Sequence, residues 1–408
     1  MDRRLGVSNL KRKVCMLLCY LPFLDARIFK NEAQSLLKNG YDVTMIVPRK
    51  NGHLYDIDGT PFTNEFHDQT FIYQGVKIVT YDDKGRTTNP STDPLYKLGV
   101  LEEADIYHAH ELSSFYYGSQ IKKTLREEKS KKSHLIYDSR QLVPDPFSTK
   151  INDNTKKSWH EMLLNSIKEV DYIIAVSDSI KSWYLSLDPS LPVEIIYNTP
   201  PLTSTFKQKE EANDKFIVCH EGNLSPSSGD INKIFSITDS CRKVMDFQFK
   251  VIGGPRYGEN INTPDSLKKN LIFTGWVDYN SIPNVMLDVD IGWIDLDTTH
   301  SLNNMYAMPN KFFSYLNNGI PVLVNRSTDM EKFIRTYHCG LVIDKLNPTA
   351  EDYTKALLYL YNHKDELKQM HRNARKVVES YYSWEVMEHR LLKVYESLYS
   401  EKISYFTL

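Results

Sequence analysis

A proline, an asparagine and a lysine, at Pro309, Asn310 and Lys311, stand at the start of a segment with helical spacing that ends at Gly319. Proline is favoured in the first turn of a helix, and glycine is favoured just after the last turn. The first backbone N–H groups of a helix lack partners within the helix, and the helix dipole makes that end positive. Together with the lysine, this helix start is typical of a site that binds an anion such as phosphate.

Other polar side chains directly follow apolar runs that have the length of buried strands. Glu221 and Asn223 follow "FIVC", and Arg256 follows "FQFKVIGG". Open α/β sheets bind ligands at the carboxyl ends of their strands. We therefore expect Glu221 and Asn223 to hydrogen-bond ligand hydroxyls and Arg256 to reach a phosphate. The alternative is structural: Lys311 is solvated, Arg256 pairs with a nearby acid, and Ser314 packs within its helix.

The motif "HAHEL" carries two histidines, His108 and His110, at the end of another apolar run. A histidine at a strand end can hydrogen-bond a sugar hydroxyl and respond to a developing positive charge. The two-residue spacing can also suit a metal, but no cysteine or third ligand stands at a matching position. We therefore expect no metal site, and His110 remains either a site residue or a structural loop histidine.

The elements that must position these side chains alternate between strand and helix. The run 14–20, the helical pattern 25–40 and the run 41–47 form one strand–helix–strand unit, which implies a parallel sheet. The same alternation continues to residue 198 and starts again at residue 216, so we expect two doubly wound α/β domains. The expected limits are a basic tail over 1–12, a first Rossmann-like domain over 13–200, a linker over 201–214, a second Rossmann-like domain over 215–382, and a helix over 383–408 that crosses back to the first domain.

The composition is that of an ordinary globular protein, with 41% hydrophobic and 25% charged residues among 408. A formal net charge of -2 argues against a nucleic-acid partner. Five cysteines without metal-ligand spacing predict reduced thiols and a cytoplasmic location. The basic tail, with Arg3 and Arg4, is either solvated or touches the inner face of an anionic membrane.

Ten motifs in one order, from "LDARIFKNEAQSLLKNGYDVTMI" through "ADIYHAHEL", "HEGNLSPSSGD" and "FQFKVIGG" to "AMPNKFFSYLNNGIPVLV" and "YSWEVMEHRLLKVY", span residues 13–395. With these motifs in this order, the chain resembles the retaining nucleotide-sugar glycosyltransferases of family four. The resemblance implies the GT-B fold, in which two Rossmann-like domains face a cleft, and it implies transfer with retention from a nucleotide sugar, UDP-linked, to a glycan, lipid-linked or protein acceptor. It implies no bound cofactor.

The resemblance also assigns roles to residues. It places His110 beside the transferred sugar as the catalytic residue, and Asp25, Arg27 and Arg140 on the acceptor side. Asp25 and Arg27 equally suit a plain helix start, since aspartate is a favoured N-cap residue. The donor side comprises Glu221, Gly222, Asn223, Arg256, Tyr306, Pro309, Asn310, Lys311 and Ser314.

This sequence departs from the family pattern on the donor side. Where relatives carry two glutamates separated by seven residues, it has Tyr306 and Ser314, and no Asp or Glu occurs from residue 298 to 328. The basic positions of the loop after "FIVCHEG" correspond to the uncharged Asn223 and Ser228. Two alternatives to catalysis follow. One is a non-catalytic member that binds glycan or stabilises a partner glycosyltransferase, and the other is a nucleotide-sugar epimerase, which the missing carboxylates disfavour.

Overall fold

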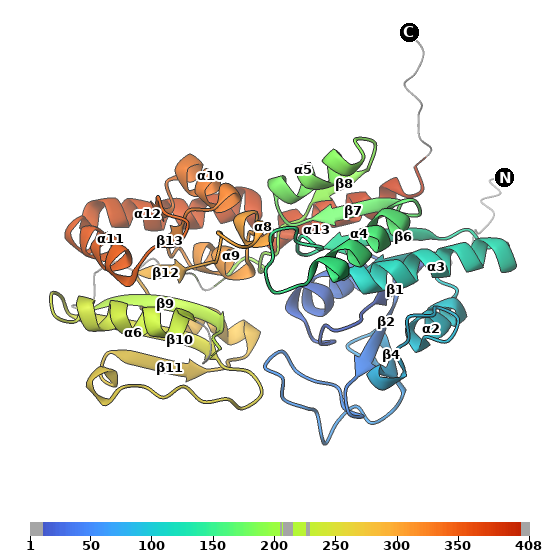
Figure 1. Cartoon of the computed structure of the whole chain (residues 1–408), viewed down its shortest axis with the longest axis horizontal. Coiled ribbons are helices and arrows are strands. Elements are labelled where there is room, and N and C mark those ends of the chain that lie inside the picture. Colours follow the sequence, from blue (N-terminus) through green and yellow to red (C-terminus); the bar gives the residue numbers. More distant parts are fainter. Residues whose placement is uncertain (1–10, 205, 207–214, 226–228, 401–408) are drawn as a thin grey trace, which may run out of the picture.

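Two parallel sheets, one from each half of the chain, form the framework of the computed structural model, which describes residues 11–204, 206, 215–225 and 229–400 (Figure 1). The basic residues Arg3 and Arg4 and most of the expected linker lie outside the described residues. The five cysteines are all buried and free. No helix among the described residues has the length and apolar character needed to cross a membrane.

The first sheet has the order β3-β4-β2-β1-β5-β6-β7-β8, and every pairing except β3 with β4 is parallel. Its order reverses between β1 and β5, and such switch points are where open α/β sheets bind ligands. The elements of this half are β1 (Lys13–Leu17), the π-helix η1 (Ala26–Ala33), α1 (Gln34–Lys38), β2 (Asp42–Arg49), β3 (Thr70–Tyr73), β4 (Val76–Asp82), the 3₁₀ turn η2 (Asp83–Gly85), α2 (Pro94–Glu102), β5 (Ile106–Ala109), α3 (Leu112–Glu128), β6 (His134–Ser139), α4 (Asp153–Ile167), β7 (Tyr172–Ala175), α5 (Asp178–Leu187) and β8 (Val193–Ile195).

The second sheet is wholly parallel, with the order β11-β10-β9-β12-β13-β14, and its order reverses between β9 and β12. The elements of this half are β9 (Phe216–Asn223), α6 (Gly229–Cys241), β10 (Phe247–Gly254), η3 (Asp265–Leu267), β11 (Leu271–Gly275), η4 (Tyr279–Ser281), α7 (Ile282–Val285), β12 (Ile291–Ile294), α8 (Leu302–Met305), α9 (Asn310–Asn317), β13 (Val322–Asn325), α10 (Thr328–Tyr337), β14 (Gly340–Ile343), α11 (Ala350–Asn362), α12 (Lys364–Val377), the π-helix η5 (Val378–Tyr382) and α13 (Trp384–Ser397).

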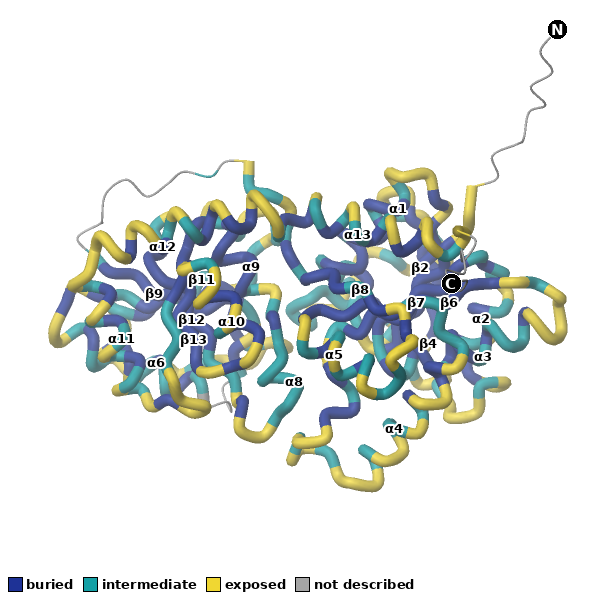
Figure 2. Tube along the Cα trace, turned by 90° about the horizontal axis from the view of Figure 1, so that it is seen from above, coloured by how far each residue is buried: buried dark blue, intermediate teal, exposed yellow. Residues whose placement is uncertain are grey.

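The helix α13 follows the second half in sequence but packs on the first half, as Figure 1 shows. The indole Nε1 of Trp384 donates to Ser35 Oγ at 3.0 Å, and the hydroxyl of Tyr395 lies 2.9 Å from His108 Nδ1. Buried strands occupy the centre of each half, and the loops carry most of the exposed residues (Figure 2). This arrangement places the carboxyl ends of β1, β5 and β9 toward the space between the two sheets.

Candidate functional site

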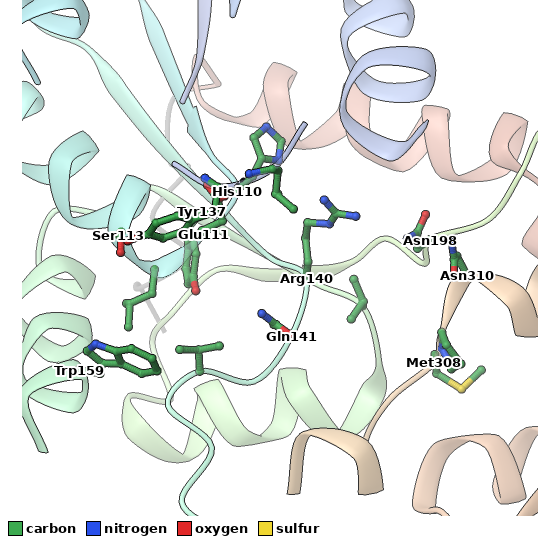
Figure 3. A pocket seen from close by; sticks show the side chains of 16 residues that line it. His110, Glu111, Ser113, Tyr137, Arg140, Gln141, Trp159, Asn198, Met308 and Asn310 are labelled. Carbon is green, nitrogen blue, oxygen red and sulfur yellow. Dashed lines mark hydrogen bonds between the residues drawn. The ribbon is translucent and has the colours of Figure 1, made fainter. Parts of the chain in front are cut away.

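Two adjoining cavities lie between the two halves of the molecule. The smaller has a volume of about 260 Å³ and the larger about 690 Å³. Arg140, Asn198 and Asn310 line both cavities, so the two form one continuous cleft. Figure 3 shows the larger cavity, with Arg140 and Gln141 between the walls contributed by the first half and Asn310 on the second half. The cleft therefore offers adjacent places for two ligands.

Most of the residues predicted from sequence meet at the smaller cavity. Pro309 lies beside Asn310 on the larger one, and Tyr306 packs instead against the apolar core of the first half. Ser228 lies outside the described residues. The predicted residues that line the smaller cavity are Asp25, Arg27, Arg140, Glu221, Gly222, Asn223, Arg256, Asn310, Lys311 and Ser314.

The start of α9 brings a cation to the cleft. Pro309 has extended backbone angles and precedes the helix, and no acidic residue occupies the first turn. The side-chain oxygen of Asn310 accepts a hydrogen bond from the Lys311 N–H at 2.9 Å. Burial lowers the pKa of Lys311 below its ordinary value, and the nearby Glu221 opposes that effect. An anion at this helix start would supply a second negative partner for the lysine.

Two glycines allow the ends of β9 and β10 to approach each other closely at the cavity wall. Gly222 and Gly253 are paired in the parallel ladder and have φ angles of +105° and +109°. A Cβ atom on Gly253 would lie 2.5 Å from the carbonyl oxygen of Gly222, which is closer than real contacts allow. A Cβ atom on Gly222 would lie 3.8 Å from the Lys311 ammonium. These glycines therefore keep the wall beside Lys311 open.

Aromatic side chains that sequence reasoning did not identify line the far end of the smaller cavity. Trp276 donates from its indole Nε1 to the carbonyl of Pro255 at 2.9 Å, and the Arg256 guanidinium lies 5.8 Å from the Trp276 ring centroid. Tyr279 is half-buried there, and burial raises the pKa of its hydroxyl. The two rings sit in the loop after β11, and nothing in their spacing marks them as site residues. They provide flat apolar surface for a planar ligand group.

Asp25 and Arg140 pair with each other at the first-half wall. Asp25 caps η1, since its Oδ1 accepts from the N–H groups of Arg27 and Ile28 at 3.0 and 3.1 Å. Arg140 Nη1 donates to Asp25 Oδ2 at 3.1 Å, and both side chains remain partly exposed to the cleft. The helix-start role of Asp25 is thus present in the structure together with a position at the cavity.

Arg27 and His110 line the cleft with side chains that are almost wholly buried. Both side chains have 0% exposure, although Arg27 belongs to the lining of the smaller cavity and His110 to that of the larger one. Arg27 donates from Nε and Nη2 to Asp138 at 2.8 and 3.1 Å and from Nη1 to the carbonyl of Ile196 at 3.0 Å. His110 Nδ1 lies 3.5 Å from Asp138 Oδ2. Asp138, a buried carboxylate inside an apolar strand, therefore holds the Arg27 guanidinium and lies close to the His110 ring.

Glu32, His108, His110 and Asp138 form a buried group whose atom types suit a metal ion. The Arg27 Nε lies 3.0 Å from Glu32 Oε1 as well as 2.8 Å from Asp138, so a guanidinium already stands between the two carboxylates. It holds the pKa of Asp138 below its ordinary value, while burial and the Asp138 charge raise that of Glu32. The cluster thus has its own cation, and its chemistry is that of a buried ion pair.

A loop of the first half holds a helix of the second half across the cleft. Asp145, which follows Arg140 and Gln141, accepts hydrogen bonds from Leu302 N at 3.1 Å, Asn303 N at 3.2 Å and Ser301 Oγ at 2.7 Å. These groups form the start of α8, so an aspartate of one half caps a helix of the other. The segment after α8 leads directly to Pro309 and Asn310, and this contact therefore fixes one rim of the larger cavity.

Comparisons with known proteins concern both the sequence and the fold. Residues 232–387 match the family described as "Glucosyltransferase 3-like, C-terminal domain". "Putative glycosyltransferase YtcC" of Bacillus subtilis (strain 168) is 22% identical over 265 residues, which cover 59% of this chain. The match spans 63% of that relative's length, or less than two thirds.

Solved structures resemble nearly the whole chain. Sucrose-phosphate synthase from Thermosynechococcus elongatus has a TM-score of 0.65 at 12% identity, covering 95% of this chain and 99% of its own. Anabaena Alr3699/HepE in complex with UDP-glucose has a TM-score of 0.65 at 13% identity, covering 94% and 99%. These likenesses show that the chain has the GT-B fold. The matched family is described as glucosyltransferase-like and the curated relative as a putative glycosyltransferase.

Proposed function

We propose that this protein transfers a sugar from a nucleotide-sugar donor to a glycan, lipid-linked or protein acceptor, with retention at the anomeric carbon, as in the family it resembles. The observation that carries the proposal is the position of Lys311 and the start of α9. They stand where the smaller cavity, lined by both halves, meets the larger one. A site of that kind suits a diphosphate that joins a nucleoside on one side to a sugar on the other.

The two cavities divide the substrates between them. In this proposal the nucleoside occupies the smaller cavity, with its base toward Trp276 and Tyr279, and the diphosphate lies against Asn310 and Lys311. The transferred sugar and the acceptor then occupy the larger cavity, beside Arg140 and Trp159. The structure of Alr3699/HepE contains UDP-glucose, so UDP-linked sugars are the first donors to test.

The residues of this chain would act mainly on the leaving group. As the bond from the sugar to the diphosphate breaks, the bonding electrons pass to the phosphate oxygen, and the acceptor hydroxyl forms the new bond and releases its proton. The Lys311 ammonium and the first N–H groups of α9 would stabilise the growing negative charge. Burial of Lys311 strengthens this interaction, because less water competes for the charge.

A second function, a non-catalytic glycan-binding or stabilising partner of an active glycosyltransferase, draws support from one observation. The ring of His110, which the family resemblance places beside the transferred sugar, is buried in the ion cluster of Arg27 and Asp138. A chain in which this histidine takes no part in catalysis would still bind substrates with the same fold. Binding of a nucleotide without turnover in the presence of acceptors would favour this function.

The experiment combines binding and turnover. UDP, GDP, ADP and their common sugar conjugates are titrated against the full chain by calorimetry, and conjugates that bind are incubated with acceptor glycans. We expect one nucleotide to bind, and Lys311→Met to weaken it about 10- to 100-fold through loss of a charge-assisted hydrogen bond. Lys355→Met, a surface lysine that is 71% exposed, is the matched control and should leave binding unchanged.

Turnover is measured as product formation, with the anomeric configuration read by NMR. Retention predicts the same configuration in donor and product. Absence of binding by every nucleotide would contradict the proposal. An equal loss of binding in Lys311→Met and Lys355→Met would show that Lys311 at the start of α9 does not bind the diphosphate.

A further inference from the structure

Glu221 presents a buried carboxylate oxygen that has no hydrogen-bond partner. The residue lies near the end of β9 with 9% of its surface exposed, and it lines the smaller cavity together with Lys311 and Ser314. Its Oε2 atom is buried and without a partner, whereas buried polar groups in folded proteins are nearly always paired. An acceptor of this kind on a cavity wall is a place where a ligand donor completes the hydrogen bonding.

The backbone of Glu221 is held in position by hydrogen bonds to α9. The hydroxyl of Tyr315 accepts a hydrogen bond from the Glu221 N–H at 2.7 Å and donates to the carbonyl of Cys219 at 3.1 Å, which locks the end of β9 to α9. Burial raises the pKa of Glu221 above its ordinary value, and the Ser314 hydroxyl and the Lys311 charge oppose that effect. Ser314 and Lys311 thus favour the ionised, hydrogen-bond-accepting form.

Charges in this cavity stand on the opposite elements from those that the family resemblance leads one to expect. Ser314 stands on α9 at the position where the resembled family carries a glutamate. In this chain the carboxylate comes instead from Glu221 on β9. The cation comes from Lys311 on α9, while Asn223 at the end of β9 is uncharged. A negative and a positive charge are therefore both present in one cavity. Each comes from the element that carries the opposite charge in the family that the chain resembles.

The position of Glu221 indicates which part of a nucleotide it would contact. It shares the smaller cavity with Tyr279, at the aromatic end, and with Lys311, at the start of α9. It therefore lies in the same cavity as the expected places of a base and of a diphosphate. In a nucleotide, the group that joins these two parts is the ribose, which carries two neighbouring hydroxyls.

We propose that Glu221 binds the 2′- and 3′-hydroxyls of the ribose and that Ser314 positions its carboxylate. This inference rests on the proposed function, because it requires a nucleotide in the smaller cavity. The ribose hydroxyls donate to the carboxylate, and a ligand without them leaves Oε2 buried and unpaired. Discrimination against deoxyribose is then the direct measure of the contact.

The test compares UDP, GDP and ADP with their 2′,3′-dideoxy counterparts by calorimetry. The unmodified chain is expected to bind the ribonucleotide about 10- to 100-fold more tightly, the range of a hydrogen bond to a charged group. Glu221→Ala should weaken the ribonucleotide to the level of the dideoxy form and leave the dideoxy form nearly unchanged. Glu351→Ala, at a carboxylate that is 75% exposed, is the control and should keep full discrimination.

A second variant returns the carboxylate to α9. Glu221→Ser combined with Ser314→Glu should recover a large part of the discrimination that Glu221→Ala loses. If the unmodified chain binds ribo and dideoxy forms equally, the inference fails while the proposed function stands. If Glu221→Ala weakens both forms equally, Glu221 is structural and the inference is overturned. If no nucleotide binds at all, the proposed function and this inference both fail.

Discussion

Arg27 and Asp138 form a two-point ion pair with no exposed surface on either side chain, through Nε to Oδ2 at 2.8 Å and Nη2 to Oδ1 at 3.1 Å. The pair joins η1 to the end of β6 directly beneath the cleft. The nearby Glu32 is a weak substitute partner, because burial and Asp138 raise its pKa. The pair therefore determines the shape of the cleft floor.

Asp138→Asn is expected to destabilise the protein by about 3–5 kcal/mol, because the guanidinium of Arg27 would stay buried without its full counter-charge. Urea unfolding followed by circular dichroism measures the change. The control is Glu351→Gln, which breaks an exposed i,i+4 pair and should cost less than about 0.5 kcal/mol. Equal effects in the two variants would show that the buried pair contributes nothing.

The Glu221→Gln variant is expected to gain stability relative to the unmodified chain as the pH rises from 4 to 8. The pKa of Glu221 is raised in the fold, so its contribution to stability is greatest at low pH and falls as pH rises through the folded pKa. Glutamine does not titrate. In this variant Lys311 also loses the negative charge of Glu221, which opposes the lowering of its pKa by burial. The lowered pKa of Lys311 likewise makes the variant more stable as pH rises.

Melting temperatures of both chains across that pH range measure the effect. A stability difference that stays constant with pH, or moves toward the unmodified chain, would contradict the raised pKa of Glu221.

Asp145→Ala is expected to loosen the contact between the two halves. It removes the acceptor for Ser301 Oγ and for two N–H groups at the start of α8, and the loss of a helix cap costs about 0.5–2 kcal/mol. Proteolysis of the segment around α8 should become faster, and small-angle scattering should show a larger radius of gyration. Asp153→Ala, at a fully exposed position in α4, should change neither measurement.

Gly253→Ala is expected to destabilise the protein by more than 2 kcal/mol and to weaken nucleotide binding. The added Cβ would meet the Gly222 carbonyl at 2.5 Å, in addition to the cost of a φ angle of +109°. Gly258→Ala is the matched control, since Gly258 also has a positive φ, of +72°, but open space around the added atom. Its cost should be about 1 kcal/mol, and equal costs would show that the contact with Gly222 relaxes freely.

The fold could be predicted from sequence because apolar runs of strand length alternate with helical patterns along the whole chain. The run "FQFKVIGG" coincides with β10, Phe247–Gly254. The strand β3 (Thr70–Tyr73) escaped prediction, although Gln74 and Gly75 after it have positive φ angles and form the two-residue turn of a hairpin with β4. The helices α11 and α12 are divided at His363, which caps the first and precedes the second.

The candidate site was predictable where a side chain follows a strand or opens a helix, because the ends of parallel strands converge on the switch point. Glu221, Asn310 and Lys311 meet at one cavity for that reason. Asp138 was not identified because it lies within an apolar strand, and only the packing shows that it pairs with Arg27 and lies 3.5 Å from His110 Nδ1. Trp276 and Asp145 are single residues in loops, whose positions depend on how the two halves meet.

Because α13 packs on the first half, the first half can complete its folding only after α13 has been synthesised. Trp384 and Tyr395 meet Ser35 and His108, partners that lie 349 and 287 residues earlier in the sequence. A ribosome releases the amino-terminal sheet first, while the helix that covers His108 is still to be made. Until then the apolar groove for α13 faces water or a chaperone. The helix α13 thus packs on a sheet whose strands lie far earlier in the chain, and this contact can form only after the second half has been made.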